Sequence, residues 1–391
     1  MRYIWQHIRA VIEQYNGGIP LSHFLKNYFR IHPKLGSRDR RIISEMAYCY
    51  YRLSRGLDAS IPLEDKVRIS LFIAETSVPQ ITTFLPAEWG PKAGSPEERI
   101  MQLQQQGIDF TYQGLTGFDL RLSGSFTYES WQEAMPLSPL LFIRIRKRKE
   151  HCLQALTAAG VEYHEIRKNV LALRTTTALE KWLPADCYVV QDASSQRTGD
   201  YFKPVHGEHW WDCCSGAGGK SLLLREQSQK IRLTVSDKRA TILHNLKERF
   251  RLYGYESPET LQLDVSDPEA VNAQLQGRKF SNIICDVPCS GSGTWFRTPE
   301  QLFFFETEKV RQFAALQHSI TQNAIRYLKP GGRLIYITCS VFHAENEAVV
   351  EAILEDGDMV CEKHELINGL ADRADCMFIS VIKKRATSGG A

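Results

Sequence analysis

The sequence lacks any run of about 18 consecutive apolar residues, the length that a membrane-spanning helix needs. Its first residues, MRYIWQHIRAVIEQY, predict an amphipathic helix and lack the continuous apolar core of a signal peptide. The composition, with 43% hydrophobic and 24% charged residues, is typical of a soluble globular protein. We therefore expect a cytoplasmic protein with no membrane partner, whose 391 residues form two or three domains.

The sequence also lacks the cysteine spacing of zinc sites and of disulfide frameworks. Its ten cysteines include no Cys-x-x-Cys pair, and no His-x-x-x-His pair accompanies them. We therefore expect no metal site. Most of the cysteines are predicted to be small core residues in a reducing compartment, with Cys289 and Cys339 as the exceptions.

A large excess of one charge is absent as well, because the formal net charge is only +3. The basic residues are nevertheless clustered. Eight Lys or Arg residues but only two acidic ones lie between Lys26 and Arg55, and a second cluster, FIRIRKRK, covers residues 142–149. Local basic patches in a nearly neutral chain indicate a polyanion bound on one face, with a solvated basic surface as the alternative. The residues expected to contact nucleic-acid phosphates are Arg144, Arg146, Lys147 and Arg148.

Helical periodicity dominates the first part of the chain. The segment SRDRRIISEMAYCYYRLS, which begins at Ser37, has an apolar stripe that includes Ile42, Ile43, Met46 and Tyr50. Other segments in this part have apolar residues at the same spacing of three and four. We therefore expect a helical domain over residues 1–135.

The periodicity changes near residue 137. The segment LLFIRIRK alternates between apolar and basic residues, which predicts a half-buried strand with Arg144 and Arg146 on a basic outer surface. One helix and two more strands follow. The pattern predicts a small α/β module over residues 136–185, which is either a spacer between domains or a sheet that faces nucleic acid.

Strands and helices alternate over residues 186–391. Short apolar strands are predicted at HWWDC, RLTVSD, LQLD, NIICDV and RLIYITCS, with helical segments between most of them. Repeated strand–helix units predict an α/β fold with a parallel sheet that helices cover on both sides. Ligands of such sheets bind beyond the carboxyl ends of the strands.

A glycine-rich loop, DCCSGAGGKS, follows the first of these strands and precedes a helix. It is not a phosphate-binding Walker loop, because Cys214 takes the place of the required glycine, and it is not a dinucleotide loop, because Ser221 takes the third glycine position. Asp237 and Asp264 end the next two strands, where carboxylates would bind a ribose hydroxyl and an adenine amino group. This combination predicts S-adenosylmethionine. The alternative is that the two aspartates only cap the helices that follow.

Two cysteines, Cys289 and Cys339, are predicted at the ends of the fourth and fifth strands, and Asp286 precedes the first of them in DVPCSGSG. This set suits methylation of carbon 5 of a pyrimidine, in which a thiolate adds to carbon 6 and carbon 5 then attacks a sulfonium methyl group. Asp286 would hydrogen-bond the ring and favour protonation at nitrogen 3. The second thiol would help to remove the carbon-5 proton or to release the enzyme.

These motifs resemble those of RNA cytosine-5 methyltransferases of the Nop/Sun type, the family that includes the bacterial ribosomal-RNA enzyme. The family's glycine loop appears as DCCSGAGGKS, its Asp-x-Pro-Cys motif as DVPCSGSG and its Thr-Cys-Ser motif as TCSVFHAENE. The segment VVQDASSQ, residues 189–196, is similar to the entry into the catalytic domain. The resemblance implies a Rossmann-like methyltransferase domain over 186–391, an RRM-like module over 136–185 and a helical RNA-binding domain over 1–135.

The resemblance also implies roles for single residues. Cys339 would be the nucleophile, Cys289 would assist product release, and Lys220 would lie near the cofactor and the catalytic groups. The residues implied to bind S-adenosylmethionine are Cys214, Ser215, Gly216, Ala217, Gly218, Gly219, Lys220, Asp237, Asp264 and Asp286. One departure from the family pattern is Ala217, which replaces the usual proline of the loop and removes its constraint on φ.

The resemblance implies that the protein forms 5-methylcytosine in RNA and so takes part in ribosomal RNA processing, with ribosomal RNA favoured over transfer RNA. A monomer is the default expectation for an enzyme that must surround a large RNA. One alternative is an RNA-binding ribosome assembly factor with little turnover, against which the intact cysteine pair argues. Another is a DNA cytosine-5 methyltransferase, in which Cys289 would attack; the Thr-Cys-Ser motif disfavours it.

Overall fold

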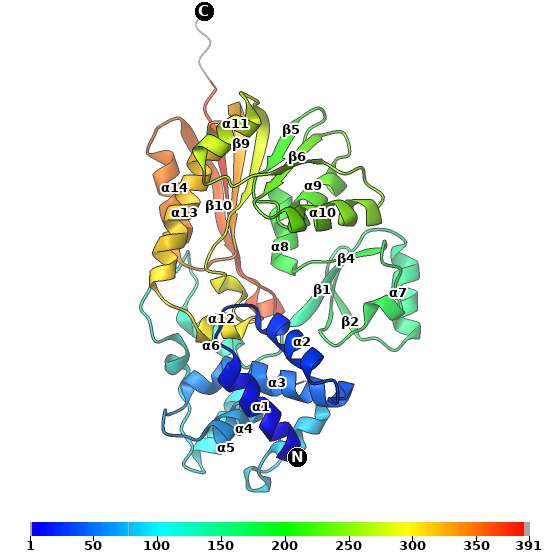
Figure 1. Cartoon of the computed structure of the whole chain (residues 1–391), viewed down its shortest axis with the longest axis vertical. Helices are drawn as coiled ribbons and strands as arrows, with labels where there is room; N and C mark the ends of the chain where they lie inside the picture. The colour runs from blue at the N-terminus through cyan, green and yellow to red at the C-terminus, as the bar shows by residue number, and fades with distance from the viewer. Residues whose placement is uncertain (1, 77, 387–391) are drawn as a thin grey trace, which may run out of the picture. The chain divides into compact units, whose positions relative to one another are not determined.

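The computed structural model describes residues 2–76 and 78–386, which divide into two compact units (Figure 1). The first unit comprises the residues up to Leu120 together with Thr127–Pro139 and Thr294–Glu306. The second comprises Arg121–Phe126, Leu140–Gly293 and the residues from Thr307 on. Each unit therefore includes a short segment from the other's part of the sequence. None of the described helices combines the length and apolar character needed to cross a membrane.

The first unit is built from helices in the part of the chain that the structure describes. Their bounds are α1 (Arg2–Gln14), α2 (Leu21–Ile31), α3 (Ser37–Leu53), α4 (Leu63–Ile73), α5 (Pro96–Gln104), α6 (Tyr128–Ala134) and α12 (Pro299–Phe303). The helix predicted from Ser37 is α3, and Ile42, Ile43 and Met46 of its apolar stripe are buried. That prediction is confirmed.

The late segment Thr294–Glu306 packs into the first unit through aromatic side chains. Trp295 stacks on Trp131 with ring centroids 4.8 Å apart, and both side chains are buried. Glu300 of α12 accepts a hydrogen bond from the Leu21 amide at the start of α2. Arg52, the basic residue in the last turn of α3, is buried and donates to the Phe296 carbonyl. The aromatic residues near Trp295 therefore belong to a hydrophobic core.

A four-stranded antiparallel sheet opens the second unit. Its strands are β1 (Leu140–Ile145), β2 (Tyr163–Arg167), β3 (Val170–Arg174) and β4 (Tyr188–Val190), in the order β2–β3–β1–β4. Helix α7 (Lys149–Ala158) packs on it around Ile143, Ile145 and Cys152. The strand β4 was not predicted. The assignment of this module as RRM-like and the division into three domains stay predictions.

The main sheet of the second unit has seven strands in the order β10–β11–β9–β8–β5–β6–β7. The predicted strands are β5 (His209–Asp212), β6 (Arg232–Asp237), β7 (Glu259–Gln262), β8 (Phe280–Asp286) and β9 (Leu328–Thr338), and they run parallel. Two strands that were not predicted, β10 (Met359–Ile367) and β11 (Met377–Lys384), are antiparallel. The sheet is therefore mixed, and the expectation of a purely parallel sheet is wrong at this edge.

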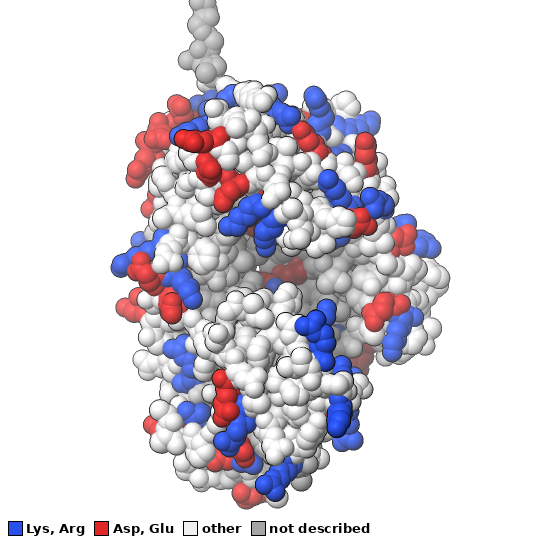
Figure 2. Space-filling view, in the orientation of Figure 1, with Lys and Arg blue, Asp and Glu red and all other residues white. Residues whose placement is uncertain are grey.

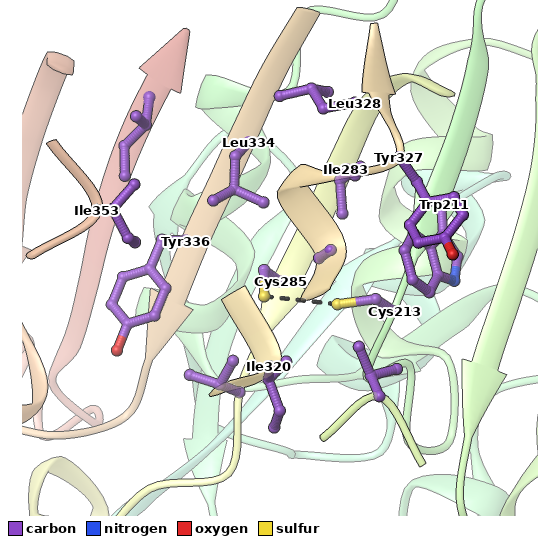
Figure 3. Packing of buried hydrophobic residues seen from close by; sticks show 14 of the residues in the cluster. Trp211, Cys213, Ile283, Cys285, Ile320, Tyr327, Leu328, Leu334, Tyr336 and Ile353 are labelled. Carbon is purple, nitrogen blue, oxygen red and sulfur yellow. Dashed lines mark hydrogen bonds between the residues drawn. The ribbon is translucent and has the colours of Figure 1, made fainter. Parts of the chain in front are cut away.

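Helices cover both faces of this sheet. Successive residues of a strand point to opposite faces, and in β5 the neighbours Trp210 and Trp211 are both apolar and buried. Trp211 packs in a cluster with α11 (Pro268–Leu275), α13 (Glu308–Ile325) and α14 (Glu347–Leu354). Trp210 packs in another with α9 (Gly219–Gln227) and α10 (Ala240–Leu252). Figure 3 shows the first cluster, in which the sulfurs of Cys213 and Cys285 lie 3.4 Å apart. Both are core residues, as predicted.

A short segment from the N-terminal part of the chain, Arg121–Phe126, packs beside the end of β9. The Ser123 amide donates to the Val341 carbonyl at 2.8 Å. The Ser123 hydroxyl donates to Glu347 and accepts a hydrogen bond from the buried side chain of Asn346. This segment therefore supports the loop that follows Cys339.

Candidate active site

The parallel strands of the second unit end at a cavity of about 490 Å³. Side chains at the ends of β5 to β9 line it, together with apolar residues of α13 such as Phe313 and Ile320. The predicted site residues in its lining are Cys214, Asp237, Asp264, Asp286, Cys289 and Cys339. The fold therefore brings together, at one edge of the sheet, the acids and the cysteines that lie far apart in the sequence.

The glycine loop between β5 and α9 is anchored to the next strand. The Ser215 amide donates to the Ser236 carbonyl at 2.9 Å, and the Gly216 amide donates to the Asp237 carboxylate at 3.1 Å. Gly218 has φ +80°, and a Cβ atom there would lie 2.7 Å from Cγ of Leu246, so this position requires glycine. Ala217 is also held, because its carbonyl accepts a hydrogen bond from Arg249. Backbone hydrogen bonds and side-chain contacts thus order the loop without the proline.

Not all of the predicted loop residues reach the cavity. Its described lining includes Cys213 and Cys214 of the loop. It does not include the predicted residues Ser215, Gly216, Ala217, Gly218, Gly219 and Lys220. Asp237 is bound by the Gly216 amide and by Arg239, and this environment lowers its pKa although burial alone would raise it. Asp264 accepts hydrogen bonds from the amide and the hydroxyl of Ser266, which lowers its pKa.

The alternative was that Asp237 and Asp264 only cap helices, and for Asp264 this alternative is wrong. The cap of α11 is Asp267, whose carboxylate accepts hydrogen bonds from the amides of Glu269 and Ala270. Asp264 instead forms a turn with Ser266 and lines the cavity. Asp237 does accept a hydrogen bond from the Arg239 amide just before α10, so it supports the helix start and lines the cavity at the same time.

The two predicted cysteines lie side by side in the cavity lining. The sulfurs of Cys289 and Cys339 lie 3.2 Å apart, although the residues are 50 positions apart in the sequence. The hydrogen bond with Cys339, and then burial, raise the pKa of Cys289 well above its ordinary value. Cys289 is therefore held as a neutral thiol beside Cys339.

Lys220 and Asp286 form an ion pair next to the cysteines. The Lys220 ammonium lies 2.9 Å from the Asp286 carboxylate, and only 12% of the lysine side chain is exposed. Burial works against the charged lysine, but the charges of Asp286 and Cys339 raise its pKa above the ordinary value. The site therefore contains a fixed cation that interacts electrostatically with Cys339.

Asp212, at the end of β5, is a buried acid to which the sequence assigned no role. Burial raises its pKa to about 7, although a hydrogen bond from the Ser221 hydroxyl favours the charged form. Its Oδ1 atom has no hydrogen-bond partner among the described residues. The signal in the sequence was its place as the first residue of the glycine loop motif.

The sequence also missed a buried acid behind the cysteines. Glu345 is fully buried, and its carboxylate accepts hydrogen bonds from Ser290, Ser340 and Gln317. The residue belongs to the segment TCSVFHAENE, whose resemblance to the family motif was noted without a role for its acids.

The four residues expected to contact phosphates are all engaged in ion pairs within the second unit. Arg144 and Arg146 bind Glu226 of α9 at 2.8 and 2.6 Å, and 11% and 8% of their side chains are exposed. The expected basic outer surface of β1 is therefore absent, because α9 covers that face. Lys147 and Arg148 pair with Asp186 and remain about half exposed. A phosphate contact stays a prediction for these two.

Comparison with known proteins finds one family model that matches part of the chain and several relatives that share one name. Residues 200–374 match the family model of the 16S rRNA methyltransferase RsmB/F. Ribosomal RNA small subunit methyltransferase B of Vibrio cholerae is 26% identical over 381 residues, which cover 86% of each chain. The protein of the same name from Serratia proteamaculans is 31% identical over 278 residues, 66% of this chain and 63% of its own. Other relatives of this name are covered over less of their length, for example 38% in Xanthomonas campestris.

Solved structures resemble the chain over most of its length. The crystal structure of PH0851 has a TM-score of 0.68 at 18% identity, covering 93% of this chain and 95% of the other. NSun6 from Pyrococcus horikoshii with SFG has a TM-score of 0.57 at 16% identity, covering 70% and 96%. At these identities the likeness supports the fold alone, and it confirms the predicted α/β fold with a Rossmann-like sheet.

Proposed function

We infer that this chain, whose residues 200–374 match the RsmB/F methyltransferase domain, methylates carbon 5 of a cytosine in ribosomal RNA. The domain match confirms the predicted resemblance to the Nop/Sun family and the predicted cofactor, S-adenosylmethionine. The observation that carries the choice of reaction is the pair of sulfurs, Cys289 and Cys339, 3.2 Å apart in the cavity at the strand ends. Methylation of a ring nitrogen or a hydroxyl group needs no such pair.

The cofactor residues fit a nucleoside with a sulfonium group. Asp237 and Asp264 are suited to hydrogen-bond the ribose and the adenine, since both carboxylates line the cavity and both have a lowered pKa. S-adenosylmethionine, when bound, supplies an electrophilic methyl group. The chain's own contribution is an ordered glycine loop and a cavity whose apolar wall includes Phe313 and Ile320.

The reaction that we propose begins with the Cys339 thiolate, which adds to carbon 6 of the cytosine ring and forms a carbon–sulfur bond. Carbon 5 thereby becomes nucleophilic and would take the methyl group of bound S-adenosylmethionine, whose carbon–sulfur bond to that methyl group breaks and leaves S-adenosylhomocysteine. Nitrogen 3 takes up a proton from solvent as the thiolate adds, and Asp286 at the ring edge accepts a hydrogen bond from it; this proton returns to solvent when the thiolate leaves. Water takes the carbon-5 proton, the ring double bond forms again as the bond to the Cys339 sulfur breaks, and Cys289 assists the departure of the Cys339 thiolate.

The electrostatics of the site favour Cys339 over Cys289 as the nucleophile. Lys220 interacts with Cys339, and a cation beside a thiol stabilises its thiolate. Cys289 has a strongly raised pKa and so stays protonated at neutral pH. A neutral thiol is a poor nucleophile, so the raised pKa of Cys289 argues against the arrangement of DNA cytosine-5 methyltransferases.

Exposed basic residues of the first unit are candidates for phosphate contacts. Figure 2 shows Lys and Arg side chains gathered over the region of α2. Among the basic residues from 26 to 55, five are exposed: Lys26, Arg30, Lys34, Arg38 and Arg41. Arg52 and Arg55 instead donate to backbone carbonyls. We propose that the exposed five, with Lys147 and Arg148, bind RNA phosphates, and that the protein acts as a monomer in the cytoplasm.

The proposal is tested by trapping the covalent intermediate. Cys289→Ala, incubated with S-adenosylmethionine and 16S ribosomal RNA, should accumulate a protein–RNA adduct on a denaturing gel, because release is blocked. Cys339→Ala should give neither adduct nor methyl transfer. Exchange of these two results would assign the nucleophile to Cys289. Wild-type protein that methylates no ribosomal or transfer RNA would favour the assembly factor.

A second test addresses the RNA surface. Reversal of the charges of Lys34 and Arg38 should weaken RNA binding and reduce its salt dependence by about one unit of slope for each lost contact. Arg225→Glu provides a control for charge reversal elsewhere. Arg225 lies on α9 and donates to the carbonyls of Gln229 and Ile231, which follow that helix. An unchanged slope in the Lys34 and Arg38 variants would return this patch to a solvated surface.

A further inference from the structure

Glu345 joins the two loops that carry the cysteine sulfurs. Its carboxylate accepts hydrogen bonds from the Ser290 amide at 2.8 Å and from the Ser290 hydroxyl at 2.5 Å. It also accepts one from the Ser340 hydroxyl at 2.6 Å. Ser290 follows Cys289 and Ser340 follows Cys339 in the sequence, so a single carboxylate holds both loops one residue away from their sulfurs.

Helix α13 adds a third support to the same carboxylate. Gln317 donates from its amide group to Glu345 at 3.1 Å and to the Pro288 carbonyl at 3.0 Å. Pro288 directly precedes Cys289, so the loop of this cysteine is held on both sides of it. Gln317 and Glu345 are both fully buried, which removes solvent as a competing partner for these hydrogen bonds.

We propose that Glu345 is a positioning residue for the methyl transfer, because its carboxylate ties the Cys289 loop to the Cys339 loop and so sets the distance between the two sulfurs. This inference rests on the function proposed above. It assigns a specific task to an acid that lies outside the cavity lining and that touches neither the cofactor residues nor the sulfurs in the described contacts.

The charge of Glu345 supports a second consequence. Burial raises the pKa of Glu345, and the hydrogen bonds from Ser290, Ser340 and Gln317 oppose that rise. Glu345 accepts hydrogen bonds from the Ser290 amide and the Gln317 amide group on one oxygen, which can accept in either protonation state of the carboxyl group. Its negative charge contributes to the raised pKa of Cys289, after the hydrogen bond with Cys339 and burial. Lys220, which carries the opposite charge to Glu345, interacts electrostatically with Cys339. Glu345 thus interacts electrostatically with Cys289, and Lys220 interacts with Cys339.

Other titratable groups around the sulfurs do not distinguish them in this way. Asp286 is paired with Lys220, and Asp212 is buried behind that pair with a pKa of about 7. Cys214 lines the same cavity, and Tyr336 donates its hydroxyl to the Glu345 carbonyl. Of these groups, Glu345 is the acid whose interaction with Cys289 raises the pKa of that thiol.

The first experiment measures thiol reactivity without RNA or methyl donor. In a Cys339→Ala background, Glu345→Gln should increase the rate at which iodoacetamide alkylates Cys289 at pH 7.5, as followed by peptide mass spectrometry. The matched control is Glu351→Gln, which makes the same charge change at an exposed position of α14 and should leave the rate unchanged. Equal alkylation rates in the two variants would overturn the electrostatic role.

The second experiment measures turnover with the full-length chain. Glu345→Gln should lower kcat roughly 10- to 100-fold while KM for RNA and for S-adenosylmethionine stays the same, because misplaced reacting groups slow the chemical step. Glu351→Gln should match the wild type. A rise in KM with unchanged kcat would overturn the positioning role. If no variant and no wild-type protein transfers methyl groups, the proposed function fails, whereas the alkylation result still decides the interaction between Glu345 and Cys289.

Two milder variants keep the proposal testable if Glu345→Gln does not fold. Ser290→Ala should change the alkylation rate of Cys289 and leave that of Cys339 the same. Ser340→Ala should do the reverse, because each serine joins its own loop to Glu345, whereas the 3.3 Å contact between the two hydroxyls is lost in both variants alike. If both variants alkylate like the wild type at both cysteines, the hydrogen bonds to Glu345 do not position the sulfurs and the proposal is wrong.

Discussion

Replacement of Asp212 by Asn should change how the stability of the protein depends on pH. Burial raises the pKa of this carboxyl to about 7, and the charge of Asp286 adds to the rise. The Ser221 hydroxyl donates to one oxygen of the carboxyl group, and an asparagine oxygen can accept the same hydrogen bond. The substitution therefore removes the ionisation while it keeps the size of the side chain and this contact.

The sign of the effect follows from proton binding. An aspartate in an unfolded chain has a pKa of about 3.9. Between about pH 4 and pH 7 the folded chain keeps the Asp212 proton and the unfolded chain loses it, so stability falls as the pH rises through this window. Three pKa units at about 1.4 kcal/mol each give an upper limit of about 4 kcal/mol for this loss. The Asn variant does not lose it.

Urea unfolding at several pH values measures the difference. Relative to the wild type, Asp212→Asn should gain about 2–4 kcal/mol in the free energy of unfolding between pH 4.5 and pH 8. Asp356→Asn, a change at an exposed position after α14, is the control and should follow the wild type. Parallel curves for wild type and Asp212→Asn would refute the assignment of a buried neutral acid at the end of β5.

Three further predictions concern single contacts. Lys220→Met should lower kcat about 100-fold in a methylation assay with little change in RNA affinity, because it removes the cation that interacts with Cys339. Gly218→Ala should lower the free energy of unfolding by about 1–2 kcal/mol from the positive φ alone and by more through the contact with Leu246. Gly216 also has a positive φ but open space around it, so Gly216→Ala should lose only about 1–2 kcal/mol, which is the cost of the positive φ. Equal losses of stability in the Gly216 and Gly218 variants, measured by thermal unfolding, would contradict the contact with Leu246. Trp131→Ala should destabilise the first unit by about 3–5 kcal/mol in urea unfolding, because the side chain is fully buried against Trp295; a loss below about 1 kcal/mol would contradict that packing.

The catalytic pair could be predicted from the sequence because its signals are local. Cys289 and Cys339 each follow an apolar strand directly, and the carboxyl ends of parallel strands meet at one edge of a sheet. The same reasoning found Asp237 and Asp264. No distance between the sulfurs follows from it, because that distance depends on the hydrogen bonds around Glu345.

The features that the sequence did not predict depend on contacts between segments that lie far apart in the chain. Arg144 and Arg146 were correctly predicted on one face of a strand, but their partner Glu226 is about 80 residues away and nothing in the local pattern indicates it. Strand β10 was missed because it lies at the edge of the sheet, where its central residues are exposed and polar and the apolar alternation fails. Glu345 resembles any acid before a helix until its donors from residues 290, 317 and 340 are known.

The segment Thr294–Glu306 belongs to the first unit although it follows the second unit's strand β8 in the sequence, so each unit needs the gene region of the other to be complete. It leaves the second unit at Gly293, whose amide donates to the Cys339 carbonyl, and its side chains Trp295 and Phe296 complete the core of the first unit. A gene fragment that encoded either unit alone would produce a piece with an unfilled core or with bare aromatic rings. The helical unit is consequently no detachable accessory that recombination can exchange freely, and the two halves must be inherited as one.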